Sequence, residues 1–151
     1  MRRCPVCKQG ELEPTEHELR RELGGHVFTA RVPAQRCRAC GEGVVEGRSI
    51  ERFELKIAKA LVGAPPTGES VRFVQKAVGL KAVDLAELLG VAPETVSRWE
   101  AGRHPVDRSV HALLSLLLED RLAGTHRTED ALRKAARPEP LDEHVEIKVA
   151  S

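Results

Sequence analysis

The sequence predicts two domains, a small α+β domain at the N-terminus and an all-α domain at the C-terminus. All four cysteines lie within the first 40 of the 151 residues, in two pairs of identical spacing. The stretch from Gly63 to Gly68 has the sequence GAPPTG, which cannot continue a helix and is typical of a linker. Beyond this stretch, apolar residues recur at spacings of three and four, the pattern of helices that bury one face.

The composition favours a protein with an aliphatic core and argues against a membrane or secreted protein. Aromatic residues make up only 3% of the chain, so a core must consist mainly of aliphatic side chains. The formal net charge of +1 gives no indication of a nucleic-acid partner, and only the local placement of charges can do so. No apolar run approaches the ~18 residues of a membrane span, and no signal peptide is recognisable. We therefore expect a cytoplasmic protein with reduced thiols and no membrane partner.

The cysteine spacing predicts a metal site. Cys4 and Cys7 form one CxxC pair, and Cys37 and Cys40 form a second pair after 29 intervening residues. Each turn aims two thiolates at one point, so the two pairs complete the tetrahedral four-sulfur shell that zinc prefers. A filled shell leaves no position for a reacting water, which favours a structural ion over a catalytic one. A small domain with few large apolar side chains also needs such a cross-link. We expect one structural zinc ion in residues 1–62.

Other interpretations of the cysteines stay open. Two disulfides would require an oxidising compartment, and a redox CxxC would lie as a single pair on a βαβ unit. Iron is the main alternative metal for a four-sulfur shell. His17 and His26 lie between the two pairs and are alternative ligands, although four cysteines suffice without them.

The elements are expected in the following order. One or two short strands are expected between the cysteine pairs, with the clearest over 26–32 after a turn at Gly24-Gly25. A helix over 50–62 begins after Ser49 and ends at Gly63. Residues 63–69 form the linker. The all-α domain covers 70–124, with helices over 70–78, 83–89 and 93–101 and a longer helix capped by Asp107. A C-terminal extension, 125–151, adds a helix over 128–136 and an alternating, strand-like segment over 145–149.

Residues 80–105 contain the pattern of a helix-turn-helix. Gly90 permits a sharp turn after the first helix, and Pro93 starts the second helix, where no N–H donor is needed. Val96 and Trp99 lie three residues apart and face inward. In helix-turn-helix proteins, the N-terminal part of the second helix enters the DNA major groove. We therefore expect residues 70–124 to be a DNA-binding domain.

The outward face of the second helix supplies the candidate DNA contacts. Arg98 is the best candidate for a base contact, because its guanidinium matches the two acceptors of guanine. Thr95 suits a thymine methyl group or a phosphate, and Glu94 suits the amine of cytosine. The remaining candidates flank the groove and suit phosphate contacts: Ser97, Lys81, Arg103 and His104. The alternative is a helical protein–protein module whose charges are only solvated.

Both motifs resemble known families. Residues 91–105, with TVSRWEAG at 95–102 followed by Pro105, are similar to the Xre/Cro-type helix-turn-helix. The pairs CPVCKQG at 4–10 and CRAC at 37–40 are similar to the YgiT-type zinc finger. Together, and in this order, they resemble the MqsA antitoxins of bacterial type II toxin–antitoxin systems over about residues 1–120.

The resemblance implies a function for each part. In that family the zinc domain neutralises an mRNA-cleaving toxin, and the C-terminal domain dimerises and represses the toxin–antitoxin operon by binding a palindrome. The base-reading arginine of the family falls on Arg98. The second base-reading position, an asparagine in the family, is Glu94 here, so we expect a different operator sequence. Ala82 replaces the glutamine that usually opens the first helix of the motif.

These observations predict a dimeric, zinc-containing transcriptional regulator that binds double-stranded DNA. It would be an antitoxin that represses its own operon and binds a ribonuclease toxin through the zinc domain. The alternative is a stand-alone zinc-containing Xre-type regulator with no toxin partner. An enzyme is disfavoured, because the sequence has no His-Glu metal motif, nucleophile elbow or phosphate loop.

Overall fold

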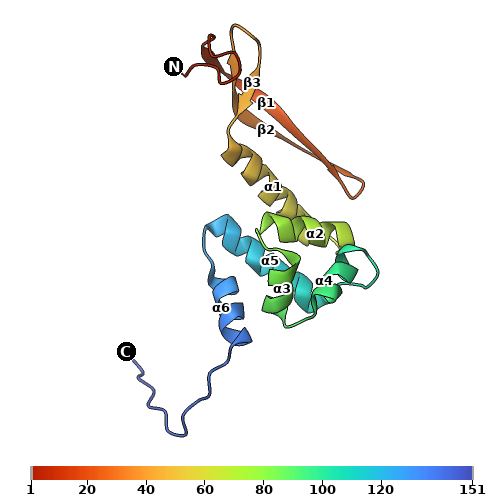
Figure 1. Ribbon diagram of the computed structural model, residues 1–151, viewed down its shortest axis with the longest axis vertical. Helices are drawn as coiled ribbons and strands as arrows, with labels where there is room; N and C mark the ends of the chain where they lie inside the picture. The colour runs from red at the N-terminus through yellow and green to blue at the C-terminus, as the bar shows by residue number, and fades with distance from the viewer. Residues whose placement is uncertain (1, 151) are drawn as a thin grey trace.

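The computed structural model describes residues 2–150, which form a three-stranded sheet followed by six helices (Figure 1). The strands are β1 (Leu12–Leu23), β2 (His26–Cys37) and β3 (Gly43–Val45), antiparallel in the order β1-β2-β3. The sheet and the helices lie at opposite ends of an elongated molecule, and α1 connects them. The helices are α1 (Gly47–Val62), α2 (Gly68–Ala77), α3 (Ala82–Leu89), α4 (Pro93–Glu100), α5 (Arg108–Ala123) and α6 (Arg127–Ala136).

The sheet is dominated by one long hairpin. β1 and β2 pair over twelve residues each, from Leu12 opposite Cys37 to Leu23 opposite His26. Gly24 and Gly25 form the turn with φ angles of 58° and 78°, a conformation that glycine adopts at little cost. The expected turn is therefore confirmed, but the strands are longer than expected. β1 has mostly charged residues exposed on both faces, so its sequence lacks the alternation that marks a strand.

The tip of the hairpin touches the helices. Leu23 and Phe28 pack against the helical core, beside the turn of the hairpin. The guanidinium of Arg21 lies 5.6 Å from the ring centroid of Phe73 in α2 and 3.9 Å from the carboxylate of Glu54 in α1. The hairpin thus carries the cysteine pairs at one end and packs against the helices at the other.

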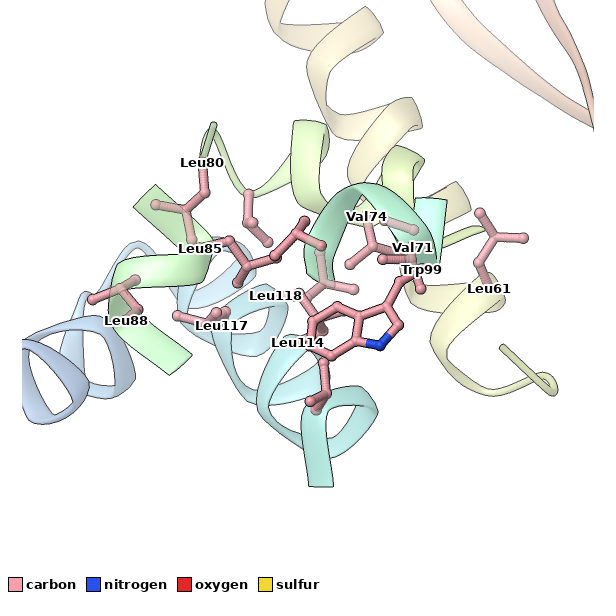
Figure 2. Close-up of a cluster of buried hydrophobic side chains, with 14 of the residues drawn as sticks. Leu61, Val71, Val74, Leu80, Leu85, Leu88, Trp99, Leu114, Leu117 and Leu118 are labelled. Atoms are coloured by element: carbon pink, nitrogen blue, oxygen red, sulfur yellow. The ribbon is translucent and has the colours of Figure 1, made fainter. Parts of the chain in front are cut away.

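The helices enclose one apolar core (Figure 2). Its centre is formed by α2 to α5, with Trp99 of α4 only 4% exposed. α1 contributes Ile57, Ala58 and Leu61 to the same core, and the Nε2 atom of His111 in α5 lies 2.8 Å from the carbonyl oxygen of Val62. The helix expected at the end of the N-terminal domain therefore packs on the helices that follow it. No helix of the described chain is both long enough and apolar enough to cross a membrane.

The helix boundaries differ from the expected ones by a few residues. α1 begins at Gly47 after Glu46, so Ser49 lies inside the helix and is not its cap, whereas Gly63 ends it as expected. α2 begins at Gly68, inside the expected linker 63–69. Thr67 caps α2 through a reciprocal pair of hydrogen bonds with Ser70, of 3.1 and 2.8 Å. This cap, rather than the apolar pattern, sets the start of the helix.

Gly68 allows α2 to meet the end of α4 without a gap. A Cβ atom at this position would overlap the carbonyl oxygen of Glu100 and lie 2.7 Å from that of Trp99. The N-terminus of α2 therefore rests directly on the C-terminal carbonyls of α4. The contact joins the positive end of one helix dipole to the negative end of the other.

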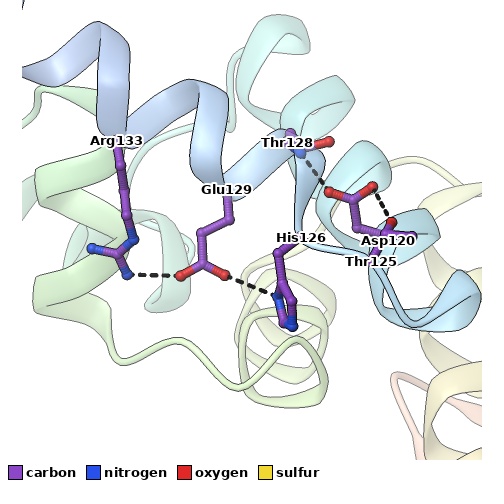
Figure 3. Close-up of polar contacts among 6 residues, drawn as sticks. All are labelled: Asp120, Thr125, His126, Thr128, Glu129 and Arg133. Atoms are coloured by element: carbon purple, nitrogen blue, oxygen red, sulfur yellow. Dashed lines mark hydrogen bonds and ion pairs between the residues drawn. The ribbon is translucent and has the colours of Figure 1, made fainter.

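The C-terminal extension contains a docked helix and an extended segment. α6 is positioned by Asp120 of α5, whose carboxylate accepts the Thr128 N–H at 2.5 Å and the Thr125 hydroxyl at 3.0 Å (Figure 3). The Thr128 N–H is the main reason that the pKa of Asp120 lies below its usual value. Glu129 in α6 pairs with Arg133 at 2.7 Å. The expected strand over 145–149 is wrong, because this segment is irregular and no strand lies beside it.

Candidate metal centre and nucleic-acid interface

The four cysteines are brought together at the open end of the hairpin, where β1 begins and β2 ends. Cys4 and Cys7 lie in the turn that precedes β1, while Cys37 ends β2 and Cys40 follows it. The N–H of Cys4 donates to the Gly10 carbonyl at 2.9 Å, which closes the first turn. The pairing of Leu12 with Cys37 then sets the two turns side by side. The sequence separation of 29 residues is therefore spanned by one hairpin.

The sulfur positions fit a tetrahedral ion. All four Sγ atoms lie within 4.8 Å of one another. The Cys4 and Cys40 sulfurs are 3.8 Å apart, and those of Cys7 and Cys37 are 3.6 Å apart. Four sulfurs at ~2.3 Å from a central zinc ion lie about 3.8 Å from each other. The group can therefore hold a metal ion with the geometry that zinc prefers.

Both cysteine turns have the same backbone. The N–H of Lys8 donates to the Cys4 carbonyl, and the N–H of Gly41 donates to the Cys37 carbonyl, each at 2.9 Å. Both donors have a left-handed backbone, with φ angles of 59° and 75°. A left-handed backbone is most often occupied by glycine, as it is at Gly41. In the first pair, however, Lys8 adopts the left-handed conformation.

Gly10 differs from Lys8 and Gly41, because it makes room for the opposite cysteine turn. Its N–H donates to the Cys7 sulfur at 3.4 Å. A Cβ atom at Gly10 would overlap the sulfur of Cys37 and would lie 2.7 Å from the Cβ of Ala39. Gly10 therefore brings the two turns into contact, a role that the sequence pattern of a single turn does not reveal.

Backbone donors favour thiolates at part of the site. The pKa of Cys7 is lowered to about 6, mainly by the Gly10 N–H and then by the Gln9 N–H. The pKa of Cys37 is also lowered, mainly by the Cys40 N–H. The Glu42 N–H lowers the pKa of Cys40, but burial and the neighbouring thiols outweigh it and raise the pKa to about 12. Four thiols so close together cannot all ionise alone, and a divalent cation supplies the compensating charge.

The cysteines also form the centre of the sheet end of the molecule. Cys4 and Cys37 are each 1% exposed, and with Leu12 they form the buried cluster of this end, supported by Cys7 and Val44. Two aliphatic residues are too few to hold a sheet. His17 and His26 are exposed on the hairpin, outside the group of four sulfurs.

The helix-turn-helix pair is formed by α3 and α4. Gly90 ends α3 with a left-handed φ of 65°, and the Val91 N–H donates to the Ala86 carbonyl at 3.0 Å. Pro93 is the first residue of α4, as expected. Val96 is fully buried and Trp99 nearly so, which fixes the rotation of α4 against the core.

The candidate DNA contacts lie on or beside the outer face of α4. Arg98, Glu94 and Ser97 are exposed, and Thr95 is half-buried. Arg103 and His104 follow α4, and their N–H groups donate to the Arg98 carbonyl at 2.9 and 3.4 Å. These bonds hold the backbone of Arg103 and His104 against the end of α4. Lys81 is exposed at the start of α3. No carboxylate in residues 2–150 forms an ion pair with Lys81, Arg98, Arg103 or His104.

A basic stripe on α1 was not recognised from the sequence. Arg48, Arg52, Lys56 and Lys59 recur at spacings of four, four and three, so they lie on one side of the helix. The apolar spacing of Ile57, Ala58 and Leu61 predicts how the helix packs but does not indicate the basic residues on its exposed side. The same spacing test applied to charge would have found it.

The chain thus combines a three-stranded sheet, six helices and a four-sulfur site suited to a metal ion. Residues 1–122 match the family described as the antitoxin component of bacterial toxin-antitoxin system, MqsA. The chain therefore belongs to the MqsA antitoxin family. α6 and the segment after it lie beyond the matched residues. No curated protein matches the sequence.

Proposed function

We propose that the protein is an antitoxin that represses its own operon by binding DNA through α4. The observation that carries this proposal is the outer face of α4, where Arg98 is exposed and has no carboxylate partner in the described residues. The buried Val96 and Trp99 hold that face outward. Membership of the MqsA family supports both the antitoxin role and the existence of a toxin partner.

In this proposal Arg98 contacts a guanine, and Thr95 and Glu94 contact neighbouring bases. Ser97, Lys81, Arg103 and His104 hold the flanking phosphates. Two copies bind the two halves of a palindrome, since one near-neutral chain offers few phosphate contacts. α5, which is rich in leucine, is the proposed dimer contact. The proposed activity is binding, with no catalysed reaction.

The cysteine group gives the N-terminal part its proposed role. Cys4, Cys7, Cys37 and Cys40 would hold one structural zinc ion that fixes the hairpin, and the domain so formed would bind a ribonuclease toxin. The proposed divisions are 1–62, 63–69, 70–124 and 125–151. α1 follows the sheet in the chain but packs with the helices, so it would hold the toxin-binding end at a fixed distance from the DNA.

Replacement of Arg98 tests the DNA-binding half of the proposal. Arg98→Ala should weaken binding to the DNA upstream of the protein's own gene by about 1–3 kcal/mol and relax its sequence preference. Lys81→Ala should instead weaken binding to all sequences alike, with a shallower salt dependence. Fluorescence anisotropy with operator and scrambled duplexes separates the two effects.

The matched control is Arg127→Ala, which removes an exposed arginine from α6. It should leave operator affinity unchanged. Equal affinities of the wild type and Arg98→Ala for the operator would remove α4 from the proposal. For the antitoxin half, the product of the neighbouring gene should co-purify with this protein. A solitary gene would favour the stand-alone regulator.

A further inference from the structure

A basic groove runs between α1 and the last turn of α5. It has a volume of about 420 Å³. Leu55 and Leu122 contribute apolar surface to it, and the basic side chains of both helices surround them. Its full lining is Arg48, Glu51, Arg52, Leu55, Lys56, Lys59, Arg121 and Leu122. The groove shares no lining residue with the proposed DNA contacts on α3 and α4.

The positive charge of this groove is largely uncompensated. Lys59 pairs with Glu119 at 3.8 Å. Arg48, Arg52, Lys56 and Arg121 have no carboxylate within 4.0 Å in residues 2–150. From Arg48 to Lys59 the stripe is about 16 Å long, at ~1.5 Å per residue. Such a row of like charges repels itself and attracts an anionic segment.

The C-terminal segment, residues 138–150, has the complementary character. It carries four carboxylates, at Glu139, Asp142, Glu143 and Glu146, against one lysine, Lys148. Apolar side chains lie among them and are exposed: Leu141 is 84%, Val145 45%, Ile147 73% and Val149 89% exposed. An acidic segment with exposed apolar residues matches a groove with basic sides and two leucines.

We propose that the basic groove of α1 and α5 binds the acidic C-terminal segment of a second copy of this chain. The carboxylates pair with the unpaired cations, and the apolar side chains cover Leu55 and Leu122. With one groove and one segment on each chain, the contact is reciprocal and closes as a twofold dimer. This contact uses none of the residues proposed to touch DNA.

The position of α6 favours the C-terminal segment of a second copy, rather than that of the same chain, as the occupant of the groove. α6 starts shortly after Arg121, but it ends beside α3, where Arg137 lies 3.6 Å from Glu87. The C-terminal segment therefore leaves the molecule at the far end of α6, first runs away from α1 and then turns back, and its end lies far from α1 (Figure 1). To reach the groove of its own chain, the segment would have to continue along the whole length of α6 to α1.

Zero-length carbodiimide cross-linking of the full chain tests this contact. An equal mixture of ¹⁴N- and ¹⁵N-labelled protein, equilibrated before reaction, distinguishes links between copies from links within one copy. We expect mixed-isotope peptides that join Lys56 or Lys59 to carboxylates of residues 139–146. Their yield should fall when the ionic strength rises from about 0.05 M to about 0.5 M, because salt screens exposed charges. The Lys59–Glu119 pair provides a same-isotope internal control.

Two variants make the test specific. Arg52→Glu should reduce the mixed-isotope links about fivefold, the effect of reversing one exposed charge in a pair. Arg31→Glu, an exposed arginine of β2, should leave them unchanged. Same-isotope links alone would show that the segment folds onto its own chain and would overturn the proposal. Formation of the Lys59–Glu119 link without any link to residues 139–146 would also overturn it.

Discussion

At Gly10 a single methyl group decides whether the two cysteine turns can meet. Gly10→Ala places a Cβ atom on the sulfur of Cys37, so the turns must separate. We expect metal affinity to fall roughly 10–100-fold, as for other residues that support metal ligands. Competition with a chromophoric chelator measures this affinity.

Gly43→Ala is the matched control, because a Cβ atom at Gly43 meets no atom within 4 Å. That variant should keep the wild-type affinity. If Gly10→Ala also kept it, the close contact between the turns would not matter for the metal site.

Single residues differ in how well sequence predicts them. The gathering of Cys4, Cys7, Cys37 and Cys40 follows from their spacing, since each CxxC turn aims its thiolates locally. The left-handed Lys8 and the close contact at Gly10 do not follow, because both depend on how the second turn lies against the first.

At the scale of elements, the contact between α2 and α4 leaves no space for a side chain at position 68. Gly68→Ala should destabilise the protein by about 1–3 kcal/mol through overpacking, although alanine normally favours a helix over glycine. Urea unfolding measures the change. Gly47→Ala is the control, since Gly47 also opens a helix but has open space around it. It should be neutral or stabilising, and an equal loss in both variants would contradict the packing argument.

The elements were predictable where local signals set them. Gly63, Gly90 and Pro93 mark helix boundaries that the structure also shows. The extent of β1 was missed because its charged sequence becomes a strand only by pairing with β2. Residues 145–149 have the alternation of a strand, but no strand lies beside them in the described chain to pair with. Hydrogen-bonding partners, which a local pattern does not contain, account for both errors.

At the scale of the whole molecule, the two ends should respond differently to chelation at neutral pH. Removal of the metal should unfold the hairpin, whose buried cluster consists mainly of the cysteines, and leave the helical core intact. Trp99, the only tryptophan, is buried in that core and reports on it alone. We expect loss of strand circular dichroism without a shift in Trp99 emission. A red shift that accompanies metal release, or no change in circular dichroism, would contradict this account.

The molecule as a whole joins these ends more closely than the sequence suggested. The glycine and proline residues after Val62 predicted a break between independent parts. Apolar residues of α1 instead enter the helical core, and the hairpin tip also packs against it. Long-range packing of this kind depends on which faces meet, and helical spacing indicates only that a face is apolar.

The central claim, that α4 binds DNA through Arg98, is tested most directly by guanine methylation interference on the DNA upstream of the gene. Methylation of guanine N7 blocks an arginine contact in the major groove. The account predicts symmetric guanines whose methylation prevents binding of the wild type but no longer matters for Arg98→Ala. Identical interference patterns for both proteins, or none for the wild type, would contradict it.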